Sequence, residues 1–145
     1  MVPAGTRRAW VTAGWIAAVV ATAPNGVIVG YGTVWFQLFG ETADAEDYRV
    51  SAGGYGAAAV VLVFAVVGIL THRAPRWLAS AAAVAAVVLA ILAINSVTSA
   101  ADAEPSHLPV NGVWDGVGGV VWAPWTWVLV GLAVHGLYRL VRSRS

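Results

Sequence analysis

Four apolar segments separated by polar connections constrain this chain more than any other feature. They cover residues 9–29, 51–70, 76–97 and 120–140. Each is about 20 residues long, the length of helix that crosses roughly 30 Å of hydrocarbon at about 1.5 Å per residue. Hydrophobic residues make up 59% of the sequence and charged residues only 10%, far from the usage of soluble domains. We therefore predict an all-α integral membrane protein whose single domain, residues 1–145, is a bundle of four transmembrane helices.

The charged residues separate according to the connection in which they lie. Seven of the eight arginines lie in the N-terminus, the second connection and the C-terminus, and all seven acidic residues lie in the first and third connections. The arginines are Arg7, Arg8, Arg73, Arg76, Arg139, Arg142 and Arg144, and the acidic residues are Glu41, Asp44, Glu46, Asp47, Asp102, Glu104 and Asp115. Arginines near span ends favour the cytoplasmic side. We expect both termini to be cytoplasmic, in the inner (plasma) membrane, with two extracytoplasmic connections of about 20 residues.

The absence of cysteine and the placement of the arginines exclude several kinds of functional site. There is no cysteine, so disulfides, thiolate metal sites and thiol nucleophiles are excluded. The arginines lie in tails and one tight connection, without the interleaved aromatic residues of a nucleic-acid surface, so no nucleic-acid partner is expected. Eight arginines without a lysine, in a chain rich in alanine and valine, suggest a GC-rich bacterial genome. No cofactor is expected.

The first span is interrupted by Pro24-Asn25-Gly26. Proline removes a backbone donor and clashes with the carbonyl four residues earlier, so the pattern predicts a helix that is kinked or that ends at the interface near Pro24. Residues 21–23 also have the Ala-x-Ala form of a signal-peptide cleavage site, although a following proline opposes cleavage. The alternation of Val27–Phe39 favours a short strand or an interface segment.

Small and aromatic residues suggest how the helices pack. Alanines at heptad-like spacing predict the bundle seam on the third span: Ala79, Ala83, Ala86, Ala90 and Ala93. Gly53, Gly54 and Gly56 are expected to loosen the start of the second span. The tryptophans at 122, 125 and 127 predict an aromatic belt at the outer interface, and a platform for a headgroup is the alternative.

Three groups of residues are candidates for function. A polar clasp or ligand site is predicted from Thr22, Asn25, Asn95 and Thr126, and a partner surface from Tyr31, Trp35, Phe36 and Phe39. Weaker candidates for acid–base or metal chemistry are Asp102, Glu104, His107, Asp115 and His135. Their spacing matches no known metal signature, so neither a catalytic set nor a metal site is predicted.

Three functions remain open. The chain is expected to be an accessory or structural subunit that acts through a membrane-protein partner or a second copy of itself. The first alternative is a small oligomeric transporter or channel with its site at the interrupted first span. The second is a lipid- or quinone-handling enzyme, which requires Asp102, His107 and Asp115 to converge.

Overall fold

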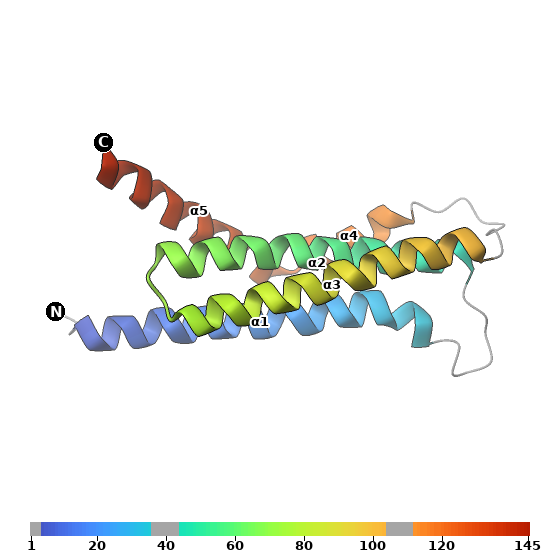
Figure 1. The fold of residues 1–145 in the computed structure, drawn as a ribbon, viewed down its shortest axis with the longest axis horizontal. Coiled ribbons are helices and arrows are strands. Elements are labelled where there is room, and N and C mark those ends of the chain that lie inside the picture. Colours follow the sequence, from blue (N-terminus) through green and yellow to red (C-terminus); the bar gives the residue numbers. More distant parts are fainter. Residues whose placement is uncertain (1–3, 36–43, 104–111) are drawn as a thin grey trace.

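Five helices account for nearly all of the chain that the computed structural model describes, which is residues 4–35, 44–103 and 112–145. They are α1 (Ala4–Trp35), α2 (Ala45–Thr71), α3 (Arg76–Asp102), α4 (Val113–Val121) and α5 (Pro124–Arg144). The first three lie alongside one another, and α4 and α5 follow α2 before α5 turns away from the bundle (Figure 1). No strand occurs among these residues.

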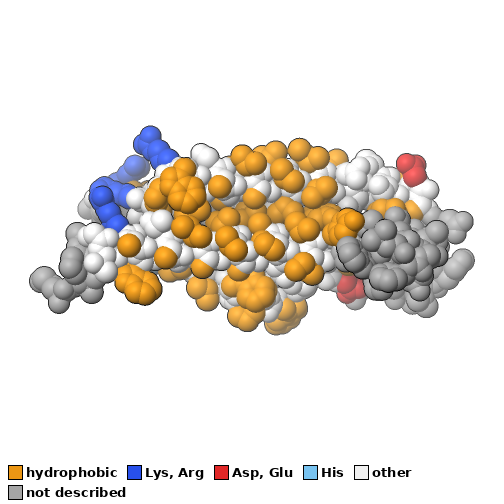
Figure 2. Space-filling view, turned by 90° about the horizontal axis from the view of Figure 1, so that it is seen from below, with side chains coloured by type: hydrophobic (Ala, Val, Ile, Leu, Met, Phe, Trp, Pro, Cys, Tyr) orange, Lys and Arg blue, Asp and Glu red, His pale blue; other side chains and the backbone are white. Residues whose placement is uncertain are grey.

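Three helices, α1, α2 and α3, are long and apolar enough to cross a membrane. The pair formed by α4 and α5 passes the same test together but is bent by 73°, which makes a fourth crossing if the pair is one span. The charges lie at opposite ends of the apolar surface (Figure 2). We call the end that holds Arg7, Arg73 and Arg139 the arginine end, and the end that holds Asp44 and Asp115 the carboxylate end.

α2 is the centre of the bundle, because it packs against each of the other four helices. Its contacts with α1 and α4 depend on glycine. A Cβ on Gly116 of α4 would collide with the carbonyl oxygen of Val50 and lie 2.6 Å from the backbone nitrogen of Gly54. A Cβ on Gly53 would likewise collide with the carbonyl of Val113. The expectation that Gly53 and Gly54 loosen the second span is wrong, because they allow two backbones to touch.

The alanine seam of α3 is partly confirmed. Ala79 and Ala86 are buried, whereas Ala83, Ala90 and Ala93 are only half-buried. Ala82, which was not predicted, is completely buried, and Leu78 and Leu89 are nearly so. The seam therefore alternates small and large side chains against α2.

The first span does not end at Pro24, because α1 continues through this residue to Trp35. Residues 27–35 are helical, so the predicted strand is wrong there, and residues 36–39 lie outside the described part. Packing explains the difference: Gly26 lies against Ala58 and Gly30 against Tyr55, and the hydroxyl of Ser51 donates to the carbonyl of Gly30 over 2.5 Å. These contacts hold the segment beyond Pro24 on α2 despite its β-branched residues.

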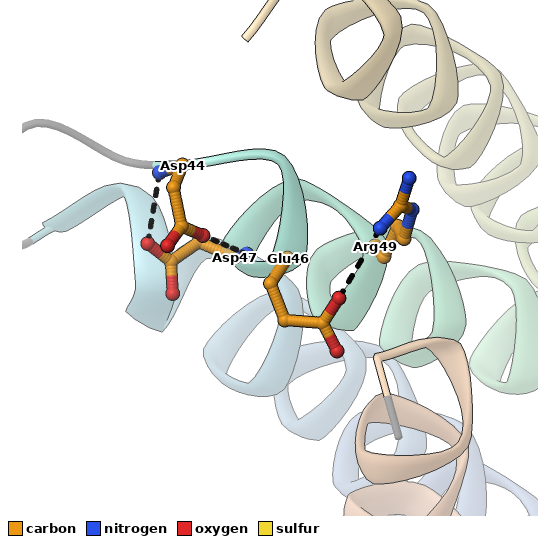
Figure 3. A network of polar contacts seen from close by, with 4 residues as sticks. All are labelled: Asp44, Glu46, Asp47 and Arg49. Carbon is orange, nitrogen blue, oxygen red and sulfur yellow. Dashed lines mark hydrogen bonds and ion pairs between the residues drawn. The ribbon is translucent and has the colours of Figure 1, made fainter. Parts of the chain in front are cut away.

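The second span begins earlier than its apolar run. Asp44 caps α2: its Oδ1 accepts from the backbone N–H of Asp47 and its own N–H donates to Asp47 Oδ2, both at 3.0 Å (Figure 3). One turn on, Arg49 Nη1 lies 3.3 Å from Glu46 Oε2. This reciprocal cap stabilises the helix end by about 1 kcal/mol and turns an expected polar loop into helix.

The prediction of a single fourth helix over residues 120–140 is also wrong, because the helix starts at Val113 and breaks at Trp122–Ala123. Gly116 lies against Val50 of α2, and Gly136 lies against Thr71, so the break falls between these two levels, near the middle of α2. Trp122, Trp125 and Trp127 are exposed there and not at an end of the bundle. The predicted outer belt is therefore displaced to mid-bundle, where Pro124 begins α5 at the position that tolerates its missing N–H.

Replacing Gly116 by alanine should disrupt the contact between α2 and α4, since the new methyl would meet backbone atoms that cannot rotate away. We expect a loss of at least about 2 kcal/mol in the free energy of unfolding, typical of overpacking in a tight core. Thermal unfolding in mild detergent measures this loss. The matched control is Gly131→Ala on α5, where a Cβ meets nothing within 4 Å. It should be neutral or stabilise by up to about 1 kcal/mol, and equal loss in both variants would refute the close-contact explanation.

Candidate functional site

A cavity lies at the arginine end, between the start of α1, the α2–α3 connection and the end of α5. Its volume is about 770 Å³. Four guanidinium-bearing residues line it: Arg7, Arg8, Arg73 and Arg139. A neighbouring hollow of about 550 Å³ adds Arg142 and shares Arg7 and Arg139. The cavity exists because α5 diverges from α1 and α2 beyond Gly136, as the separated N- and C-terminal ends in Figure 1 show.

A stack of aromatic rings lies beside this cavity, and one of its members, His72, lines the cavity. Trp15 is 2% exposed, and its ring packs against Gly68 and lies 5.7 Å, centroid to centroid, from the ring of His72. His72 lies 6.3 Å from the ring of His135. The Nδ1 of His72 is 2.8 Å from the carbonyl oxygen of Gly68. A carbonyl only accepts, so Nδ1 carries the hydrogen. His135 therefore packs against a second histidine, which the sequence did not predict.

The predicted polar clasp is only partly assembled. Thr22 is completely buried and its hydroxyl has no hydrogen-bond partner, and the buried Nδ2 of Asn25 also lacks one, among the residues that the structure describes. Thr126 is 4% exposed and its hydroxyl donates to the carbonyl of Val120 over 2.9 Å, which caps the break between α4 and α5. A buried polar atom without a partner is costly, so Thr22 and Asn25 mark the centre of the bundle as unusual.

Asn95 does not belong to this clasp. It is exposed on α3, and the hydroxyl of Thr98 donates to its backbone carbonyl over 2.8 Å. The sequence placed Asn95 at a depth similar to Thr126, but α3 makes its extensive contacts with α2 and few with α1. Depth along a span is readable from sequence, whereas the direction in which the side chain points depends on which helix is the neighbour.

The predicted partner surface lies mostly outside the description. Tyr31 is 44% exposed on α1. Trp35 lies in the last turn of α1, where its side chain is not described, and Phe36 and Phe39 are outside the described residues.

The acidic candidates do not form a site within the described part of the chain. Asp102 ends α3 and Asp115 begins α4, both with exposed side chains, and Glu104 and His107 lie outside the described residues. No cluster of three metal-ligating side chains was found among residues 4–35, 44–103 and 112–145. The one buried carboxylate described is Glu46, 9% exposed, whose Oε2 pairs with Arg49.

No family model, curated protein or solved structure matches this chain. Its function is therefore inferred from its own residues. Sequence reasoning missed the cavity, because arginines at span ends have a sufficient explanation in membrane orientation. One signal was available: the tight connection at residues 71–75 contains His72 and Arg73 where a glycine usually ends a helix.

Two buried threonines should respond oppositely to the same substitution. Thr22→Val removes a hydroxyl without a partner, so we expect the free energy of unfolding to rise by about 1 kcal/mol. Thr126→Val removes the hydrogen bond to Val120, so we expect a loss of about 1 kcal/mol. Thermal unfolding of both variants in the same detergent measures the difference. A loss of stability in Thr22→Val would mean that its hydroxyl has a partner in the membrane.

Proposed function

We propose that the chain is a membrane-embedded accessory or structural subunit, and that it works by packing another transmembrane helix against the outward face of α3. In this proposal it lies in a bacterial plasma membrane with the arginine end, and hence both termini, in the cytoplasm. The partner is a second copy of the chain or a helix of another membrane protein.

The observation that supports this proposal is a polar side chain on the outward face of α3. Asn95 is exposed, between Ile94 at 65% and Val97 at 58% exposure, about 10 Å from the end of the helix at Asp102. Its backbone carbonyl accepts from Thr98, but its side-chain amide forms no hydrogen bond within the described residues. A carboxamide facing hydrocarbon is unfavourable, and a neighbouring helix is the usual source of its hydrogen bonds.

The spacing of the exposed residues supports a helix as the partner. Seven of them recur at alternating intervals of three and four along α3, within a wider exposed face that also includes Val87, Ile94 and Val97: Ala81, Val84, Val88, Ile91, Asn95, Thr98 and Asp102. This is the heptad interval of a left-handed helix pair, in which a single asparagine at the seam sets register. The opposite face of α3, with Ala82 and Leu89, is already occupied by α2.

Replacing Asn95 by valine should weaken the association while keeping the helix apolar. An interhelical hydrogen bond contributes about 0.6–2 kcal/mol, so we expect the association constant to fall about three- to thirtyfold. Native mass spectrometry in mild detergent, with cross-linking in membranes, measures the oligomer and any protein that co-purifies. The control is Val63→Ala, which changes a residue 55% exposed on α2. A parent protein that is strictly monomeric and purifies alone would refute the proposal.

A second candidate, a small oligomeric transporter or channel, is favoured by the buried polar atoms of Thr22 and Asn25. They lie beside Pro24 on α1, and Gly119 near the end of α4 packs against Val29, so α1 and the α4–α5 break share the middle of the bundle. Broken helices that leave polar groups at mid-membrane are typical of transporter sites. Ion flux into liposomes should then be abolished by Asn25→Ala and retained in Thr98→Val. Absence of flux in the parent would reject this candidate.

A further inference from the structure

The cavity at the arginine end has no part in the function proposed above. Its positive charge comes from three separate elements: Arg7 on α1, Arg73 in the α2–α3 connection and Arg139 on α5. The only ion pair among the described residues is Arg49 with Glu46 at the other end of the bundle. The acidic residues that the structure describes all lie at that far end, near the start of α2, the end of α3 and the start of α4: Asp44, Glu46, Asp47, Asp102 and Asp115. The charges that face the cavity are therefore not neutralised by the described chain, which favours an anion between them.

Arg73 occupies a position where arginine is unfavourable. α2 ends in a Schellman motif, in which Ala74 N–H donates to Ile69 over 3.0 Å and Arg73 N–H donates to Leu70 over 3.2 Å. The residue at this point adopts a left-handed conformation, and Arg73 has φ +56°. Glycine is usual there because a Cβ is strained. Membrane orientation needs an arginine near the span end, which Arg76 supplies, but it does not need one in this conformation.

Guanidinium groups are the charged donors that the cavity offers. Thr12, Thr71, His72 and Ser143 also line it, and the hydroxyls of Thr71 and Ser143 already donate to the carbonyls of Gly68 and Leu140, at 3.1 and 2.9 Å. Arginine's planar fork of N–H groups matches the oxygens of a phosphate and binds it more strongly than a neutral donor does. The volume of about 770 Å³ is within the range of small-molecule pockets, about 300–1,000 Å³.

Apolar side chains also line the cavity. They include Val11 of α1 and Leu140 of α5, two helices that diverge toward this end (Figure 1). Their sequence neighbours Trp10 and Val141 are 73% and 67% exposed. A ligand that combines a phosphate with hydrocarbon can contact both the arginines and these apolar side chains, whereas a free phosphate contacts only the arginines.

We propose that this cavity binds the phosphate headgroup of an anionic membrane lipid, with Arg73 and Arg139 on the phosphate oxygens and the acyl chains along Val11 and Leu140. The bound lipid neutralises the arginines that line the cavity from α1, the α2–α3 connection and α5. It also fills the space that opens where α5 leaves the bundle.

Binding of short-chain lipids to the purified full-length protein in nonionic detergent tests this assignment. The probes are dioctanoyl phosphatidylglycerol, dioctanoyl phosphatidylcholine and inorganic phosphate, measured by native mass spectrometry and by titration. We expect phosphatidylglycerol to bind at least about tenfold more tightly than either other probe, as one charge-assisted contact accounts for about that factor. Equal binding of inorganic phosphate would assign the site to a soluble anion, and equal binding of phosphatidylcholine would show that charge does not matter; either result overturns the proposal.

Matched arginine variants separate the cavity from the general charge of this end. Arg73→Gly and Arg139→Gln should each weaken phosphatidylglycerol binding about tenfold. Arg76→Gln and Arg144→Gln remove the same charge from residues that line neither hollow, and should change it less than about twofold. Equal effects in all four variants would overturn the proposal.

Arg73→Gly also controls for folding, because glycine relieves the left-handed strain. Its thermal midpoint should be unchanged or higher while its lipid affinity falls, an opposition that a purely structural role would not produce. If this variant is less stable, Arg139→Gln at an unchanged midpoint gives the same test, and retained affinity there refutes the assignment.

Discussion

The rest of the structure depends on the contact of bare backbone between α2 and α4. In a membrane the lipid is as apolar as a leucine, so helices associate through close packing and not through exclusion of water. Gly53 and Gly116 allow that packing, since a Cβ at either would collide with a carbonyl oxygen of the opposite helix. α1 joins the same centre through Gly26 and Gly30. α1 and α4 thus both pack closely against the half of α2 that lies toward the carboxylate end.

Beyond its close contact with α2, the fourth span does not continue as a straight helix. The pair bends by 73° at Trp122–Ala123, and α5 then crosses the other half of α2 and departs beyond Gly136. The break exposes tryptophans at mid-bundle and is capped inside by Thr126. The departure opens the cavity at the arginine end.

The helical class, the rough spans and the charge separation were predictable, because they depend on composition over windows of about 20 residues. Most of α3 was predictable for the same reason. The continuity of α1 past Pro24 and the start of α2 at Ala45 were not, since they depend on Gly30 meeting Tyr55 and on the reciprocal cap between Asp44 and Asp47. Among the candidate residues, Thr22 and Thr126 are buried, as a polar clasp requires. The outward direction of Asn95 required knowing that α2 is the neighbour of α3.

Two residues with positive φ show how the two ends of the molecule differ. Gly112, at φ +42°, precedes α4 at the carboxylate end, and a Cβ there would lie 2.8 Å from the Oε1 of Glu46. Glycine is what both the backbone and the packing require at that position. Arg73, at φ +56°, faces an open cavity at the other end, where glycine would suit the turn equally well. A local rule that is obeyed at one end and broken at the other, without a packing reason, is expected where a side chain serves a ligand. That contrast supports the proposal of a binding site at the arginine end.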